Sequence, residues 1–287
     1  MVLTPDMKFA LAAVLLVVAL AAVYAVRVAV RGRDRFDRVE HQGGSRLLGK
    51  SAMGLGYWSL QPIARLLVAM RVDADQISWT SLVFGAVAGA FLAVGHFGYA
   101  TVCTMISGLL DTVDGMVARL SNTSSEAGEV LDSAVDRYVE FFFLSGLVLY
   151  YRAIPLLQVL ALLALLGSFM VSYSTAKAEA LNVKLPPGGM RRPERAFYLA
   201  AGAALSAVSI PWWEAERDLS RPIAYPMVVV LALVAFAANL SAIERLWSIA
   251  KSVRSREKAH SAQSAGEAAA GQKTELSNAS RRSGMRS

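Results

Sequence analysis

Two pairs of aspartates lie inside apolar stretches of this 287-residue chain, where carboxylates are costly and usually functional. Asp111 and Asp114 are three residues apart, and Asp132 and Asp136 are four residues apart. On a helix, either spacing places both members of a pair on one face. If the two helices cross a membrane in opposite directions, the end of the first and the start of the second share one depth. All four carboxylates can then converge.

Four converging anions in a low-dielectric site need cations to neutralise them. Carboxylate-only ligation favours hard ions such as Mg²⁺ or Mn²⁺, and two such ions suit in-line attack at phosphorus. The plain alternative is a set of helix-end carboxylates paired with Arg119, Arg137 and nearby loop bases. A cation transporter lined by the same aspartates is a different hypothesis. It is disfavoured because the carboxylates gather at one membrane face and no polar residues continue across.

The elements that position these aspartates are predicted to be membrane spans. Hydrophobic residues make up 55% of the chain and charged residues only 18%, whereas a soluble domain carries about 25% charged residues. The single cysteine excludes a disulfide framework and a cysteine-built zinc site. A span needs about 20 apolar residues. The predicted spans are residues 8–30, 77–95, 98–119, 129–151, 155–176, 196–212 and 224–247.

The distribution of charge predicts the orientation. Basic residues gather in 31–76, in 177–195 and from 251 onward, while the connections between the other spans are short or mildly acidic. The positive-inside rule therefore places the N-terminus outside and the basic regions, with the aspartates, at the cytoplasmic face. This pattern accounts for the net charge of +7 without a nucleic-acid partner.

The regions around the core spans have distinct compositions. Residues 1–30 are predicted to be an uncleaved anchor rather than a signal peptide, because the apolar run is long and arginines follow it. Residues 31–54 are a basic cytoplasmic linker. Residues 55–71 place most apolar side chains on one side of a helix, which predicts an interfacial helix, with a soluble juxtamembrane helix as the alternative. Residues 251–287 have almost no large apolar residues and are predicted to be a disordered basic cytoplasmic tail.

The residues between the aspartates are more specific than the aspartates alone. They form the pattern Asp111-x-x-Asp114-Gly115-x-x-Ala118-Arg119, then eight residues, then Gly128-x-x-x-Asp132-x-x-x-Asp136. At every specified position and spacing this pattern resembles the signature of the CDP-alcohol phosphotransferase family. The resemblance implies an all-α polytopic bundle of six spans over residues 55–250. The first span would be an extra N-terminal transmembrane helix, and the interfacial helix precedes the six.

The resemblance also implies roles for the motif. Asp111, Asp114, Asp132 and Asp136 would hold two divalent ions, Mg²⁺ or Mn²⁺, and Asp136 would also be the general base. The nucleotide pocket maps to Gly115, Ala118, Arg119 and Gly128, with Asp75 where the family has an amide. Small residues let a nucleotide approach the helix backbone, and arginine offers a planar cationic fork to phosphate.

The acceptor is indicated by fewer residues. Ser133, Arg137 and the segments 176–181 and 189–195 resemble the phosphatidylinositol phosphate synthase branch of the family. A basic pocket is expected from Lys177, Arg191, Arg192, Arg195 and Arg245. It would suit a phosphorylated acceptor, although the same charges could instead meet anionic headgroups. Thr175 departs from the branch, which usually has a lysine there.

The resulting hypothesis is a membrane phosphatidyltransferase of phospholipid biosynthesis. It would transfer the phosphatidyl group from CDP-diacylglycerol to the hydroxyl of a small polar alcohol, with inositol phosphate as the best guess, and release CMP. Glycerol 3-phosphate, serine and free inositol are alternative acceptors. A CDP-choline or CDP-ethanolamine donor and a non-catalytic scaffold are less favoured. The expected partners are membrane lipids and, by family resemblance, a second copy in a homodimer.

Overall fold

The structure, a computed structural model, describes residues 3–31, 49–185, 190–214 and 221–284. The described part consists of helices with connecting turns and contains no strand, as the sequence predicts. The helices are α1 (Pro5–Arg31), α3 (Gly49–Ala69), α4 (Ala74–Val94), α5 (Phe97–Leu120), α6 (Glu126–Tyr150), α7 (Pro155–Ala180), α8 (Arg192–Ser209), the short π-helix η1 (Ile210–Glu214) and α9 (Tyr225–Gly284).

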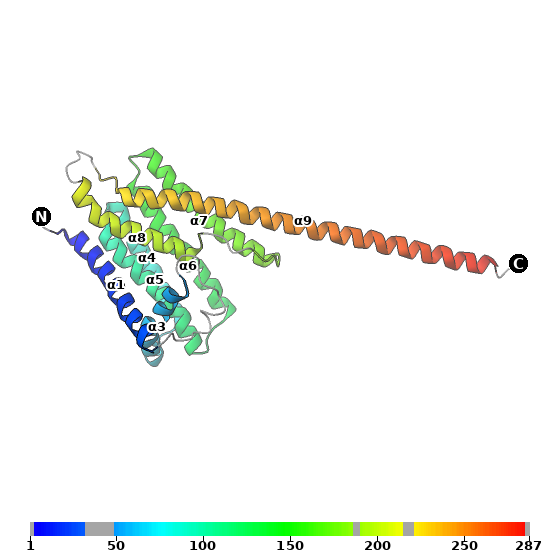
Figure 1. Ribbon diagram of the computed structural model, residues 1–287, viewed down its shortest axis with the longest axis horizontal. Coiled ribbons are helices and arrows are strands. Elements are labelled where there is room, and N and C mark those ends of the chain that lie inside the picture. Colours follow the sequence, from blue (N-terminus) through cyan, green and yellow to red (C-terminus); the bar gives the residue numbers. More distant parts are fainter. Residues whose placement is uncertain (1–2, 32–48, 186–189, 215–220, 285–287) are drawn as a thin grey trace.

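Among the described residues, six helical segments are long and apolar enough to cross a membrane. They are Pro5–Val30, Ala74–Val94, Phe97–Leu120, Pro155–Ala180, Arg192–Trp213 and Tyr225–Lys258. The other long helix of the bundle, α6, has 25 residues, and its charged first half lowers its hydropathy. It packs against α4 and α7 (Figure 1). The prediction that the chain is an integral multi-pass membrane protein is therefore confirmed.

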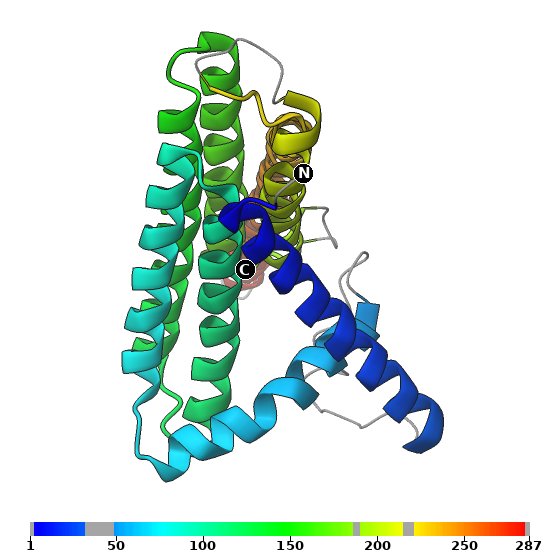
Figure 2. The same ribbon diagram turned by 90° about the vertical axis from the view of Figure 1, so that its left-hand side faces the viewer.

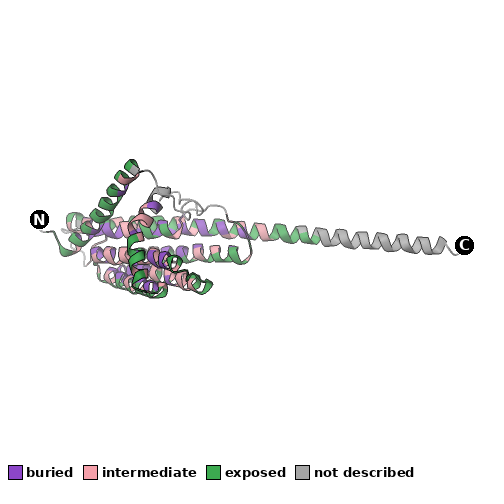
Figure 3. Cartoon of the chain, turned by 90° about the horizontal axis from the view of Figure 1, so that it is seen from below, coloured by how far each residue is buried: buried purple, intermediate pink, exposed green. Residues whose placement is uncertain are grey.

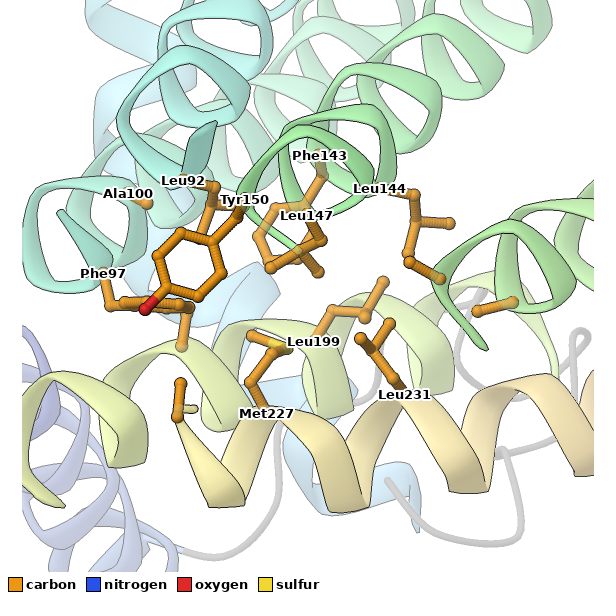
Figure 4. Packing of buried hydrophobic residues seen from close by; sticks show 14 of the residues in the cluster. Leu92, Phe97, Ala100, Phe143, Leu144, Leu147, Tyr150, Leu199, Met227 and Leu231 are labelled. Carbon is orange, nitrogen blue, oxygen red and sulfur yellow. The ribbon is translucent and has the colours of Figure 1, made fainter. Parts of the chain in front are cut away.

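The bundle core gathers side chains from α4 to α9 (Figure 4). Leu92, Phe143, Leu147 and Met227 are all at most 4% exposed. In contrast, Figure 3 shows exposed residues along the outer faces of the helices. Many of the exposed residues are large and apolar, as expected for helices that face lipid. The core therefore fixes the helices relative to one another while leaving an apolar exterior.

Two glycines bring α4 and α6 into backbone contact. A Cβ atom added at Gly146 would overlap the carbonyl oxygen of Gly89, and one at Gly89 would overlap that of Phe142. Small residues at helix interfaces in membranes allow this close approach. The contact holds α6 firmly against α4, and Asp132 and Asp136 lie nearer the N-terminal end of the same α6 helix.

The helix α3 lies across one end of the bundle, at a steep angle to the other helices (Figure 2). Its buried Leu60 and Ala64 pack against Val113 and Val117 of α5. On the outside, Ile63, Leu66 and Met70 are large apolar residues that remain exposed. This two-faced arrangement agrees with the predicted interfacial helix, although α3 begins at Gly49, within the predicted linker, rather than at residue 55.

The N-terminal helix α1 leans away from the bundle (Figure 2); it contacts the bundle near its start and α3 near its end. Near its start, the Asp6 carboxylate accepts a hydrogen bond of 3.1 Å from the backbone N–H of Tyr99 in α5. Near its end, the Tyr24 ring packs on Trp58 of α3, with 5.6 Å between ring centroids. The Arg27 guanidinium lies 5.3 Å from the centroid of the same Trp58 ring. The extra span thus braces α3 against the bundle.

The last helix differs from the predicted disordered tail. The helical backbone of α9 continues to Gly284 and extends far beyond the bundle (Figure 1). Residues 251–284 are rich in Ala, Glu, Lys, Gln and Arg, which have high intrinsic helix propensity even without apolar residues to bury. Most of the basic linker, residues 32–48, lies outside the described residues.

Candidate active site

The aspartates are carried by two consecutive helices that meet in a tight turn. Asp111 and Asp114 lie in the last three turns of α5, and Asp132 and Asp136 lie in the first three turns of α6. Carboxylate oxygens of Asp111, Asp132 and Asp136 all lie within 4.8 Å of one another. Three of the four predicted carboxylates therefore form one group whose composition and spacing suit a divalent metal ion.

The fourth carboxylate, Asp114, is held by α4 and by its own backbone. Its side chain is buried, and its Oδ2 accepts a hydrogen bond of 2.5 Å from the Ser78 hydroxyl. Its Oδ1 accepts one from the Gly115 N–H. Ser78 was not indicated by the motif, because only the packing of α4 on α5 brings it there. The sequence feature that could have indicated Ser78 is a hydroxyl side chain within the first turn and a half of an apolar span.

A pocket of about 620 Å³ opens between the start of α4, the end of α5 and the start of α6. We call it the acidic pocket, because Asp75, Asp114, Glu129 and Asp132 are among the residues that line it. Every residue predicted to contact the nucleotide also lines it, namely Asp75, Gly115, Ala118, Arg119 and Gly128. Six of the eight fixed motif residues and the start of α4 thus line one pocket, and Asp111 and Asp136 are not among its lining residues.

The start of α6 is fixed by its own cap. The Ser125 hydroxyl accepts a hydrogen bond of 3.1 Å from the Gly128 N–H, which satisfies one unpaired donor of the first helical turn. In α5, a Cβ atom added at Gly115 would lie 3.2 Å from the Arg119 guanidinium. A larger residue at 115 would therefore crowd Arg119 in the acidic pocket.

A second pocket, of about 640 Å³, lies on the other side of the first turns of α6. We call it the arginine pocket. Its lining includes five arginines, Arg137, Arg191, Arg192, Arg195 and Arg245. Glu129 and Ser133 line both pockets, so the two are adjacent across α6. Four of the five residues predicted for acceptor binding are brought together here.

Lys177 is the one of these five residues that the structure does not bring to the arginine pocket. Its side chain is exposed and does not line the arginine pocket, whereas Thr175, Ala176 and Glu179 of the same helix do. A residue two positions after Thr175 is rotated about 200° around the helix axis, because each residue turns the helix by about 100°. The lysine consequently lies on another face of α7.

Arg192 connects the arginine pocket to the carboxylates. Its guanidinium donates hydrogen bonds of 3.4 and 3.3 Å to the two oxygens of Asp111 and forms an ion pair with Asp136. Converging carboxylates require positive charge nearby, and Arg192 supplies part of it from α8.

Arg195 is fully buried, and its guanidinium is engaged. Nε and Nη2 donate to the two oxygens of Glu140 at 2.6 and 2.9 Å, and Nη1 donates to the Met190 carbonyl at 2.9 Å. This bidentate pair ties the start of α8 to α6, one turn after Asp136. Arg245 of α9 is also buried, and its Nη1 donates to the Thr175 hydroxyl at 3.0 Å. Glu140, the carboxylate that pairs with Arg195, lies outside the motif, so the motif did not indicate it.

Residues 71–247, more than half of the chain, match the family model of CDP-alcohol phosphatidyltransferases. The chain belongs to this family. It is 30% identical to the phosphatidylinositol phosphate synthase of Corynebacterium glutamicum over 159 residues, which are 53% of this chain and 72% of that protein. It is 28% identical to the enzyme of the same name from Streptomyces avermitilis, over 76% of this chain and 89% of that protein.

A solved structure supports the same assignment. The crystal structure of Mycobacterium tuberculosis phosphatidylinositol phosphate synthase with CDP-DAG bound superposes with a TM-score of 0.57 and 25% identity. The match covers 66% of this chain and 92% of that chain. This member of the CDP-alcohol phosphatidyltransferase family is therefore a membrane transferase of phospholipid biosynthesis, and most of its motif residues line the acidic pocket described above.

Proposed function

We propose that this chain transfers the phosphatidyl group of CDP-diacylglycerol to the hydroxyl of a polar acceptor, with inositol phosphate as the best candidate, and releases CMP. The observation that carries the proposal is the junction of the two pockets. The acidic pocket holds the nucleotide motif, the arginine pocket gathers cations, and both border the same turns of α6.

The donor is proposed to occupy the acidic pocket. Its cytidine diphosphate would approach α5 and α6 where Gly115, Ala118 and Gly128 leave room, with Arg119 facing a phosphate. The CDP-DAG bound to the Mycobacterium tuberculosis relative supports this class of donor. A donor that is half lipid and half nucleotide suits a pocket at the end of a membrane bundle.

Two divalent cations, Mg²⁺ or Mn²⁺, are proposed to be held by Asp111, Asp114, Asp132 and Asp136. The fit rests on oxygen-only ligands and on the mutual approach of three carboxylates within 4.8 Å. When bound, such ions neutralise the donor diphosphate and stabilise the departing CMP. Ser78 would keep Asp114 oriented for this task through its hydrogen bond.

Asp136 is proposed as the general base. Its carboxylate accepts the proton of the acceptor hydroxyl, whose oxygen forms a bond to the lipid-bearing phosphorus while the bond from that phosphorus to CMP breaks. Arg192 contacts both Asp136 and Asp111 and lines the arginine pocket, so it orients the base next to the acceptor. The arginines of that pocket would bind the acceptor phosphate.

The membrane location and the oligomeric state of the enzyme are proposed from its sequence. The basic regions favour a cytoplasmic position for the active site, in the inner or plasma membrane. A homodimer is expected from the family resemblance.

The test is CMP release by purified protein in detergent with CDP-diacylglycerol and Mg²⁺ or Mn²⁺. Inositol phosphate, inositol, glycerol 3-phosphate and serine are added separately. We expect CMP only with inositol phosphate, and none from the Asp136→Asn variant. Release with another acceptor would retain the reaction but replace the acceptor. No release with any acceptor, together with no donor binding, would overturn the proposal and make ion flux the next measurement.

A further inference from the structure

A third pocket, of about 580 Å³, lies where the turn after α7 meets α9. We call it the α7–α9 pocket; it is lined by Asn182, Val183, Lys184, Lys251, Ser252, Ser255 and Arg256. Its charged lining consists of three cations, and none of its lining residues is a carboxylate. The acidic and arginine pockets both include Glu129. The α7–α9 pocket is therefore suited to an anion.

The pocket is shaped by specific contacts rather than by loose surface side chains. The Arg256 guanidinium donates hydrogen bonds of 2.8 Å to the Leu181 carbonyl and 2.6 Å to the Asn182 carbonyl. These bonds satisfy acceptors that follow the end of α7 and fix the turn against α9. Asn182 adopts the left-handed backbone conformation, with φ of 51°, which completes the turn.

An apolar cluster lies beside this pocket. Ala178, Val183 and Ile249 are buried together where α7, the turn and α9 meet. Lys184 lines the α7–α9 pocket, whereas the next residue, Leu185, lines the arginine pocket. The two pockets therefore lie at the same end of the bundle but have no lining residue in common. A ligand of the α7–α9 pocket is distinct from the acceptor.

A tryptophan indicates where the pocket lies relative to the membrane. Trp247 is 68% exposed, and the Lys251 ammonium lies 5.4 Å from the centroid of its ring. Exposed tryptophan on a spanning helix is typical of the membrane–water interface. Lys251 is one helical turn further along α9 and thus at the level of lipid headgroups.

We propose that the α7–α9 pocket binds the phosphate of an anionic phospholipid headgroup from the same leaflet. Lysine and arginine provide charge, and the Ser252 and Asn182 side chains provide neutral hydrogen-bond donors, a combination suited to phosphate oxygens. Free phosphate shares this chemistry. The interfacial position favours a lipid, whose acyl chains can remain in the bilayer beside Trp247.

The test uses native mass spectrometry of the full chain released from detergent with phosphatidylglycerol, phosphatidylcholine or inorganic phosphate. The pocket variant is the Lys184→Gln, Lys251→Gln double substitution. The matched control is Arg254→Gln with Lys258→Gln, which removes two charges from exposed positions of α9 outside the pocket lining. Because each interfacial cation contributes a few-fold to anionic-lipid binding, we expect roughly tenfold or greater loss of phosphatidylglycerol affinity in the pocket variant alone.

The outcomes separate the sources of the ligand. Preferential retention of phosphatidylglycerol over phosphatidylcholine, lost in the pocket variant and kept in the control, supports a lipid headgroup site. Equal binding of inorganic phosphate at the same residues replaces the lipid by free phosphate and overturns the lipid proposal. Equal losses in both double variants indicate general surface attraction and also overturn it. A melting temperature measured for each variant excludes unfolding as the cause of a loss.

Discussion

The acidic pocket and the arginine pocket border the same turns of α6 but are assembled in different ways. The acidic pocket is lined from residues 73–78 and 114–133, on helices that follow one another in the chain. The arginine pocket draws residues from 129 to 245, on helices that are distant in sequence. The first can therefore be recognised from local spacing, whereas the second depends on how α7, α8 and α9 pack around α6.

The two pockets also differ in what their charged groups contact. In the acidic pocket, Asp114 is oriented by a neutral hydroxyl and a backbone N–H, so its charge stays available for a cation. In the arginine pocket, Arg192 and Arg195 already contact carboxylates. The number of arginines therefore does not measure how much of the pocket is available to an acceptor phosphate. The experiments below separate binding arginines from structural ones.

The largest effect is expected at Asp136, which lies about one helical turn beyond Ser133, a residue that lines both pockets. Asp136→Asn removes the proposed base and one carboxylate of the group within 4.8 Å. Loss of a general base alone lowers rates by about 10² to 10⁴. We expect CMP release to fall by at least about 10²-fold. Glu257→Gln, at an exposed position of α9, is the control and should remain near the original rate. Full activity of Asp136→Asn would remove the base from the mechanism.

A large effect on stability is expected at the Arg195–Glu140 pair. Arg195→Gln leaves Glu140 as a largely buried charge without its bidentate partner, and breaking a buried pair costs about 3–5 kcal/mol. We expect a lower melting temperature in detergent.

The double variant Arg195→Gln, Glu140→Gln decides which role Arg195 has. If the arginine is structural, removing the orphaned carboxylate restores much of the melting temperature and the acceptor KM. If Arg195 instead binds the acceptor, the double variant regains stability but keeps a raised acceptor KM. A single variant that melts like the original protein would contradict the structural role.

The residues that line the acidic pocket can be grouped from the sequence because most of them belong to one local motif. The residues from Asp111 to Asp136 lie on two helices joined by a short turn, so helical periodicity places each pair on one face and the turn brings the two pairs to the same end of the bundle. The membrane spans could also be predicted from the sequence, because each is an apolar stretch of about 20 residues. Ser78 was missed because its contact with Asp114 requires the packing of α4 on α5, which local spacing does not encode.

The arginine pocket shows the limit of the same approach. Charge and family resemblance selected Lys177 along with four arginines, but the helical phase of α7 turns this lysine to another face. Glu140 was visible as an intramembrane carboxylate, yet its partner is 55 positions away in sequence. The low apolar content of residues 251–287 predicted a disordered tail. The structure instead continues α9 through residues 251–284, in line with the high helix propensity of many residues there.

An intermediate effect is expected from Ser78→Ala, which removes the hydroxyl that donates to Asp114 at 2.5 Å. Partners that orient metal ligands typically contribute about 10- to 100-fold to metal affinity. We expect the Mn²⁺ concentration for half-maximal CMP release to rise about tenfold, with a parallel change in Mn²⁺ binding measured by electron paramagnetic resonance.

Ser81→Ala is the matched control for Ser78→Ala. Ser81 lies about one turn further along α4 and exchanges hydrogen bonds with Ser107 instead of an aspartate. It should leave the Mn²⁺ affinity unchanged even if it lowers stability. Equal Mn²⁺ affinities for the Ser78→Ala variant and the original protein would show that Asp114 is oriented without the hydroxyl.

The last comparison, whose Lys177 variant has the smallest expected effect, distinguishes a pocket cation from a surface cation within the acceptor residues predicted from sequence. Arg191 is half-buried and lines the arginine pocket, whereas Lys177 is exposed and lies outside it. Because a hydrogen bond to a charged group contributes about 1.5–3 kcal/mol, Arg191→Gln should raise the acceptor KM about tenfold or more. Lys177→Gln, which removes the same charge, should change it less than about twofold, since exposed charges are screened. Equal KM increases for the two variants would mean that the acceptor responds to the summed positive potential at this end of the bundle rather than to contacts inside the arginine pocket.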